Sequence, residues 1–265
     1  MATVGEIYRF LDKRVPFALQ AGFDNAGFLL GREDRLVSRV LVALDITPEV
    51  IEEAITHGAE LIVSHHPVIW GQISSVTDRD RTGRILLSLA EHRIAAICAH
   101  TNLDAVEGGV NSTLAEVLGL LSPVPLQQDG YMEDGTPYGI GRVGLRAGGP
   151  TALQAFALEV KELLHVPGVR YLDAGKPVHK VAVGGGACGG MLSLAVAHGC
   201  DTFITADLKH DIYLEAKDRG INLVDAGHHS TEALICPVLA DWLRESFPEV
   251  AVEVTCHLEE VFNAV

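Results

Sequence analysis

Hydrophobic residues recur along the first third of the chain in two alternating patterns. Residues 1–20 are predicted to form an amphipathic helix, because apolar side chains such as Ile7 and Leu11 recur at helical spacing. The segment 39–45 (RVLVALD) is continuously apolar up to its final aspartate, which is typical of a strand buried on both faces. A second apolar run at 61–63 predicts another buried strand.

Helix signals separate these runs. Thr47 and Pro48 are suited to the N-cap and the first position of a helix, and Gly58 is suited to its C-terminal cap. A further helix is predicted over 83–92 and a further strand over 94–99. Strands that alternate with helices indicate an α/β fold with mainly parallel sheets flanked by helices.

Glycine and proline concentrate in residues 122–150, where the pattern changes to loops and short strands. We therefore predict three segments. These are a first α/β lobe at 1–121, a connecting segment with short strands and a helix at 122–178, and a second α/β lobe at 179–265.

The two predicted lobes resemble each other. The segment His57–Glu60 (HGAE) and the strand after it recur 141 residues later as 198–201 (HGCD) and a second strand. The pattern His-x-x-x-acid occurs at 100–104 and again at 228–232. We interpret these repeats as an internal duplication, although similar βαβ units could also converge on such motifs. Two halves facing each other would bring their motifs into one cleft.

Composition narrows the class of protein. The 265 residues include 20 Lys and Arg against 35 Asp and Glu, a formal net charge of −15, which makes nucleic acid an improbable partner. No apolar stretch approaches the roughly 20 residues of a membrane span, and the N-terminal segment does not resemble a signal peptide. The five cysteines include no CxxC pair, which favours reduced thiols and a cytoplasmic location.

Candidate metal ligands follow one of the predicted strands. His65 and His66 come directly after the run at 61–63, and ligands of open α/β sheets bind beyond the carboxyl ends of the strands. Two adjacent histidines at a strand end point in different directions, so they could serve two metal ions. A histidine pair alone is equally compatible with a structural role.

Two carboxylates complete a candidate ligand set. Asp104 and Glu232 could bridge two cations, and His228 lies four residues before Glu232, on the same face of a helix. With His65 and His66 the set holds three imidazoles and two carboxylates, which suits Zn, Fe, Mn, Co or Ni. Without a thiolate, a closed structural zinc site is not favoured.

Other polar residues remain open to two interpretations. His100 could cap the helix that follows it or support the metal ligands from outside. Asp207, Lys209 and His210 lie where the repeat places the histidine pair, and could contact a substrate or form a surface charge cluster. His229 has no evident partner.

Several motifs together resemble those of the Nif-three-like dinuclear metal-centre family, whose members are often described as GTP cyclohydrolase type 2 homologs. The motifs that carry the resemblance are Ser64-His65-His66-Pro67, His100-Thr101-Asn102-Leu103-Asp104, Gly227-His228-x-x-x-Glu232, Asp24-Asn25-x-Gly27, Thr205-x-Asp207-x-Lys209-His210 and the glycine-rich run 184–190. The resemblance covers nearly the whole chain. One departure is His229, where the family commonly has tyrosine.

The resemblance implies a two-lobed α/β fold with two divalent transition-metal ions between the lobes. It implies that the ligands are His65, His66, Asp104, His228 and Glu232, and that the chain assembles into a toroidal homo-hexamer. We therefore expect a metal-dependent hydrolase acting on a small molecule, either a nucleotide ring or a phosphoester, with His100 or His210 as proton shuttle. The alternative is a non-catalytic metal-binding or regulatory protein that interacts with other proteins.

Overall fold

The computed structural model describes residues 2–262, which divide into two compact units. The first unit comprises residues 2–103 and 235–258, and the second comprises residues 104–234 and 259–262. Among the helices of residues 2–262, none combines the length and the apolar character needed to cross a membrane.

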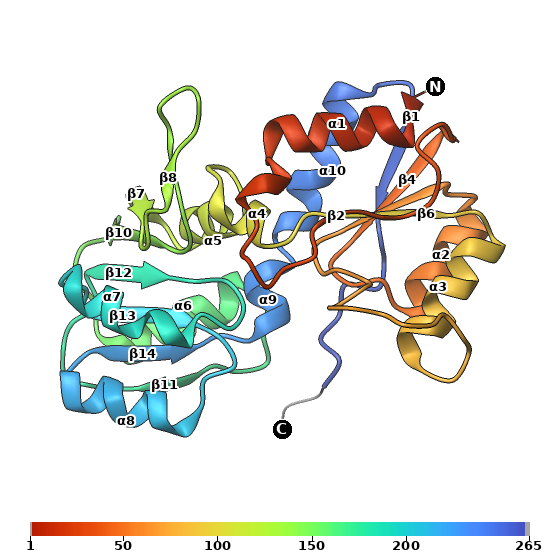
Figure 1. The fold of residues 1–265 in the computed structure, drawn as a ribbon. Helices are drawn as coiled ribbons and strands as arrows, with labels where there is room; N and C mark the ends of the chain where they lie inside the picture. Colours follow the sequence, from red (N-terminus) through yellow and green to blue (C-terminus); the bar gives the residue numbers. More distant parts are fainter. Residues whose placement is uncertain (1, 263–265) are drawn as a thin grey trace. The chain divides into compact units, whose positions relative to one another are not determined.

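Within residues 2–103 and 235–258, a five-stranded sheet forms the centre of the first unit (Figure 1). Its strands, in spatial order, are β15 (Ala251–Val254), β4 (Arg39–Ala43), β5 (Leu61–Ser64), β6 (Ala95–Cys98) and β2 (Gly27–Leu30). The first four run parallel, and β2 pairs antiparallel with β6. Strands β5 and β6 are buried along their whole length, as expected of strands covered on both faces.

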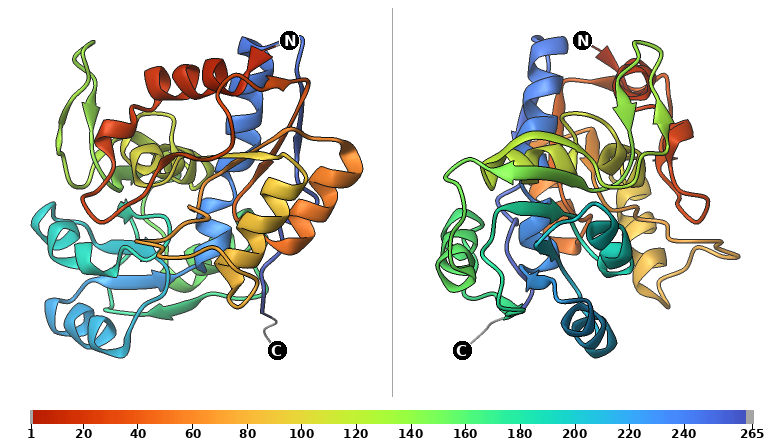
Figure 2. Two further views of the ribbon diagram at one scale, coloured as in Figure 1. Left: turned by 45° about the vertical axis from the view of Figure 1, so that its right-hand side comes forward. Right: turned by 90° about the vertical axis from the view of Figure 1, so that its left-hand side faces the viewer.

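Helices cover both faces of this sheet. Helices α2 (Pro48–His57) and α3 (Arg81–Glu91) lie side by side on one face (Figures 1 and 2). Helix α10 (Ile235–Ser246) packs against β4 and β15, and α1 (Val4–Arg14) lies on the same side of the sheet as α10. The remaining short elements are β1 (Ala2–Thr3), η1 (Phe17–Leu19) and β3 (Leu36–Val37), and α4 (Thr101–Ala105) crosses from the first unit into the second.

The start and the end of α2 follow from its sequence. The hydroxyl of Thr47 accepts a hydrogen bond from the main-chain N–H of Val50 at 3.3 Å, Pro48 occupies the first turn, and Gly58 ends the helix with a left-handed φ of 71°. These caps fix which face of α2 is buried. On this face, Ile51 packs in a cluster that includes Ile62 of β5.

A six-stranded sheet forms the centre of the second unit within residues 104–234. Its strands, in spatial order, are β11 (Arg170–Leu172), β14 (Asn222–Asp225), β13 (Thr202–Thr205), β12 (Lys180–Val183), β10 (Arg142–Arg146) and β7 (Leu120–Pro125). Strands β12, β13 and β14 are parallel, and the flanking pairs are antiparallel. A hairpin of β8 (Gly130–Tyr131) and β9 (Pro137–Tyr138) lies outside this sheet.

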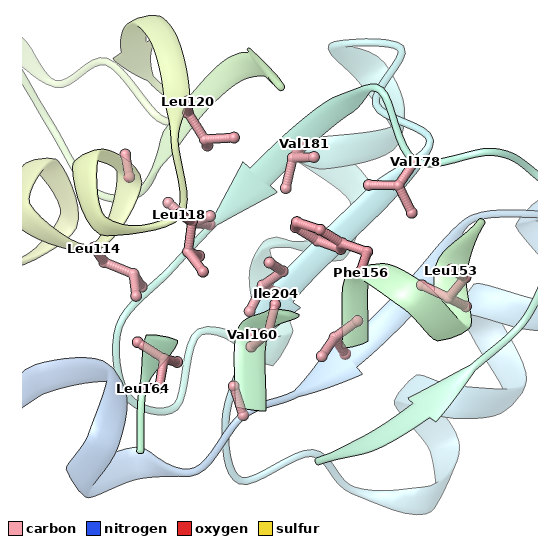
Figure 3. Packing of buried hydrophobic residues seen from close by; sticks show 14 residues of the cluster. Leu114, Leu118, Leu120, Leu153, Phe156, Val160, Leu164, Val178, Val181 and Ile204 are labelled. Carbon is pink, nitrogen blue, oxygen red and sulfur yellow. The ribbon is translucent and has the colours of Figure 1, made fainter. Parts of the chain in front are cut away.

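Both faces of the second sheet are also covered. Phe156 and Val160 of α6 (Leu153–Leu163) pack on Val181 and Ile204, together with α5 (Val110–Val117) (Figure 3). The opposite face packs against Leu192 of α7 (Leu192–Ala197) and Ala216 of α8 (His210–Arg219). The other helical elements of this unit are η2 (Gly189–Met191) and α9 (His228–Glu232).

The predicted α/β class is confirmed, with sheets flanked by helices in both units. The first sheet is mainly parallel, whereas the second has a parallel centre with antiparallel strands on both sides. In the first sheet Val40 pairs with Leu61, and in the second Val181 pairs with Thr202, each 141 residues later. An internal duplication stays a hypothesis that this correspondence motivates.

The compact units divide the chain at other positions than the three segments predicted from the sequence. Residues 235–258 belong to the first unit, because β15 pairs with β4 and α10 packs beside it. Residues 122–150 supply β10 and most of β7 to the sheet of the second unit. Both differences come from long-range strand pairing, which no local pattern of residues indicates.

Candidate metal centre

Two of the predicted ligands occupy the carboxyl end of β5. The parallel ladder continues past the strand, since the main-chain N–H of His65 donates to Ala43 at 3.2 Å and that of His66 donates to Leu44 at 2.9 Å. His65 is fully buried and His66 half-buried. The sheet therefore holds the main chain of both histidines rigidly.

His100 follows the neighbouring strand β6 and joins the other two histidines. The ring centroids of His65 lie 5.1 Å from those of both His66 and His100, and those of His66 and His100 are 5.6 Å apart. One nitrogen of each ring lies within 4.8 Å of the others, which is close enough to hold a metal ion. We call His65, His66 and His100 the histidine cluster.

Each imidazole of the histidine cluster has an oxygen acceptor at its Nδ1. The acceptors of His65, His66 and His100 are, in that order, the Ala99 carbonyl at 2.9 Å, Asp45 at 3.0 Å and Asp24 at 2.8 Å. A proton on Nδ1 serves each contact and gives Nε2 the lone pair. Histidines that bind metals through Nε2 are oriented in this way, so the cluster fits a divalent cation.

Asp24 is an ionised carboxylate that contacts His100 of this cluster. Burial alone would raise the pKa of its carboxyl, but hydrogen bonds with His100 and Thr101 lower it to about 2. The main-chain N–H of Thr101 donates to Asp24 at 3.0 Å, and the Thr101 hydroxyl donates as well. The imidazole of His100 therefore contacts Asp24 rather than capping α4.

The second unit holds a matching set of polar residues. His228 is the first residue of α9, and its Nε2 lies 3.0 Å from the Oε2 of Glu232, one turn later. The Nδ1 of His228 lies 2.7 Å from Asp207. Asp207 has a left-handed φ of 52°, a conformation that aspartate tolerates better than most residues. Asp207 therefore orients the imidazole of His228.

The glycine-rich run packs closely against this set. A Cβ at Gly186 would lie 2.1 Å from the Oε1 of Glu232 and 3.2 Å from the Nε2 of His228. The N–H of Gly186 donates to Thr231 at 3.0 Å, and that of Gly185 donates to Asn111 at 2.9 Å. Close backbone packing therefore explains the glycines at 185 and 186.

Asp104 also belongs to this part of the second unit. Burial, together with the negative charges of Asp104 and Glu232, raises the pKa of the Cys188 thiol to about 12. The two carboxylates therefore both act on one buried thiol, which stays protonated.

Two predicted residues are not brought into these sets. His210 is an exposed residue at the start of α8, and its side chain makes no hydrogen bond within residues 2–262. His229 lies beside His228 on α9 and is half-buried.

Sequence reasoning missed an aromatic pair next to the histidine cluster. The ring of Trp70 lies 5.5 Å from that of His100, at 77°, and the ring of Phe23 lies 6.4 Å from Trp70. Phe23 is 70% exposed and Trp70 is 59% exposed. Asn25 donates to the carbonyl of Ile69 at 2.8 Å and so joins the two loops. Their positions beside the Asp24-Asn25 and His65-His66-Pro67 motifs were the available signal.

Fold and side chains together define an α/β protein that carries candidate metal-binding histidines and carboxylates. The sequence profile of the Duf34/NIF3 (NGG1p interacting factor 3) family matches residues 2–261. The chain belongs to this family.

Individual relatives agree with this assignment. A Clostridium perfringens protein named "GTP cyclohydrolase 1 type 2 homolog" is 35% identical over 247 residues, which cover 91% of each chain. The crystal structure of Staphylococcus aureus hypothetical protein SA1388 matches with a TM-score of 0.89 and 31% identity, covering 99% of both chains. A Bacillus cereus protein related to NIF3 has the same fold, with a TM-score of 0.93 at 24% identity over 100% of this chain and 99% of that one.

Proposed function

We propose that this protein binds two divalent transition-metal ions through His65, His66, Asp104, His228 and Glu232 and acts as a metal-dependent hydrolase. The observation that carries the proposal is the histidine cluster with an oxygen acceptor at every Nδ1. His228 repeats the arrangement with Asp207. Imidazole and carboxylate donors suit Zn, Fe, Mn, Co or Ni.

The match to the Duf34/NIF3 family spans both sets of ligands, which supports assigning them to one centre. Five ligands shared by two ions would leave coordination positions for water and substrate, as catalytic sites require.

Each of the proposed site residues has a separate role in catalysis. Bound divalent ions would supply Lewis acidity, which polarises the substrate and lowers the pKa of water. His100, held by the ionised Asp24, is suited to accept a proton and return it to the leaving group. We retain His210 as an alternative proton shuttle. Asp45 and Asp207 position His66 and His228.

The aromatic pair favours one class of substrate. The exposed rings of Phe23 and Trp70 lie beside His100 and offer a surface on which a planar ring can stack. A phosphoester without such a ring would leave them unused. The name "GTP cyclohydrolase 1 type 2 homolog" borne by several relatives accords with a nucleotide ring as substrate.

A second candidate function is non-catalytic. The family description "NGG1p interacting factor 3" names an interaction between proteins, which favours a metal-binding regulatory protein. A homo-hexamer and a cytoplasmic location also remain our proposals for this chain.

A hydrolysis assay tests the leading proposal. Metal-loaded protein should consume GTP, and removal of the metal with a chelator should abolish turnover, with recovery when the metal is restored. Turnover should fall by about 100-fold or more in the His100→Gln variant, as expected for a lost proton shuttle. Metal-loaded protein that leaves GTP, other nucleotides and phosphoesters unchanged would favour the regulatory function instead.

A further inference from the structure

A second group of metal-ligating side chains lies in the first unit, apart from the histidine cluster. It combines Glu53 of α2 with Cys256 and His257, which follow β15 at the end of the sheet. One ligand atom of each residue lies within 4.8 Å of the other two. We propose that these three residues bind a single zinc ion, and we call them the Cys256 site.

Glu53 is the fixed member of the Cys256 site. It is only 9% exposed, although it carries a charge. Its Oε1 and Oε2 accept hydrogen bonds from the main-chain N–H of Cys256 at 3.0 and 3.2 Å, and the Thr255 hydroxyl donates to Oε2. Hydrogen bonds to these oxygens lower the pKa of Glu53 although burial raises it, so the carboxylate stays ionised at neutral pH. An ionised carboxylate has further lone pairs for a cation.

The main chain that carries the other two ligands is equally well held. The N–H of Thr255 donates to Val42 of β4 at 2.9 Å, which extends the parallel ladder beyond β15. The N–H of His257 donates to the Thr255 hydroxyl at 3.2 Å. Because Cys256 and His257 are exposed, their side chains can turn toward a cation without disturbing packed neighbours. The site therefore combines a fixed backbone with adjustable donors.

The donor atoms select the metal. A thiolate, an imidazole and a carboxylate form a mixed set that suits Zn²⁺ and its substitute Co²⁺, whereas Mg²⁺ and Ca²⁺ require oxygen ligands. Three protein ligands leave one tetrahedral position open.

The thiolate gives the Cys256 site a spectroscopic signature that the proposed dinuclear centre does not share. Titration of metal-free, reduced protein with Co²⁺ should produce a thiolate-to-cobalt charge-transfer band in the near ultraviolet, with an amplitude that corresponds to about one thiolate-bound ion per chain. The Cys256→Ser variant should lose this band. The His257→Ala variant should need about tenfold more Co²⁺ to reach it.

Two control variants keep the result specific. Cys188→Ser removes the thiol next to Asp104 and Glu232, and His65→Ala removes a proposed ligand of the dinuclear centre. Both should retain the band. No band in the unaltered protein, or a band that survives in Cys256→Ser, would overturn the proposal. Since the Cys256 site shares no ligand with the dinuclear centre, either outcome leaves the proposed hydrolase to its own test.

Discussion

Among individual residues, three aspartates orient the histidines of the candidate centre. Asp24, Asp45 and Asp207 each meet the Nδ1 of a histidine, and none of them was assigned this task from the sequence. Asp24 was visible in a motif, but its partner His100 lies 76 residues away. Sequence shows which residue types are present, whereas pairing across such separations requires the fold.

Asp24 should make stability depend on pH. Its pKa of about 2 lies below the ordinary value of 3.8, so its contribution is full above about pH 4 and is lost as the pH falls through about 2. Asp24→Asn should lower the free energy of unfolding of metal-free protein by about 1–2 kcal/mol at pH 7, and by less at pH 3. Urea unfolding at both values measures this.

The control is Asp34→Asn, which alters a carboxylate in an exposed pair with Arg32 and should have little effect at either pH. An effect of Asp24→Asn that is equal at pH 7 and pH 3 would contradict the assignment.

Trp70 should report binding of a planar ring. The other tryptophan, Trp242, is 8% exposed and covered by Arg14 at 4.1 Å. In the Trp242→Phe variant, fluorescence comes from Trp70 alone and should be quenched by GTP in the absence of metal. The matched Trp70→Phe variant should show no quenching. Equal quenching in both variants would rule out stacking on Trp70.

At the scale of elements, local signals explain most of what the sequence predicted. The cap residues of α2 and the apolar runs of β4 and β5 act within a few neighbouring positions, and all three elements occur as expected. The residue against which the glycine-rich run packs could not be predicted, because Glu232 of α9 lies more than 40 residues later.

Gly186 should be intolerant of any side chain. Gly186→Ala places a methyl group 2.1 Å from the Oε1 of Glu232 and adds the strain of a φ of 61°. We expect a loss of at least about 1 kcal/mol beyond that of Gly199→Ala, whose φ of 70° carries the same strain without a neighbour within 4 Å. Thermal unfolding of the two variants makes the comparison, and equal losses would show that Gly186 does not pack as described.

For the whole molecule, the order of the elements along the chain does not indicate which of them belong to which unit. The sequence predicted the α/β class and the five proposed ligands, but it did not indicate that α10 and β15 complete the sheet of the first unit. A parallel strand contributed from more than 200 residues away has the same local pattern as one in the second unit. The same pairing carries Cys256 and His257 to Glu53, which is why the Cys256 site was not recognised either.

The proposed function requires that this chain hold two metal ions through the five proposed ligands. The most direct measurement is the metal content of gently purified protein by elemental analysis, made in a Cys256→Ser background so that the Cys256 site does not contribute. We predict about two transition-metal ions per chain, which are lost when His65→Ala and Glu232→Ala are added. The absence of metal in both proteins, or equal metal in both, would contradict this prediction.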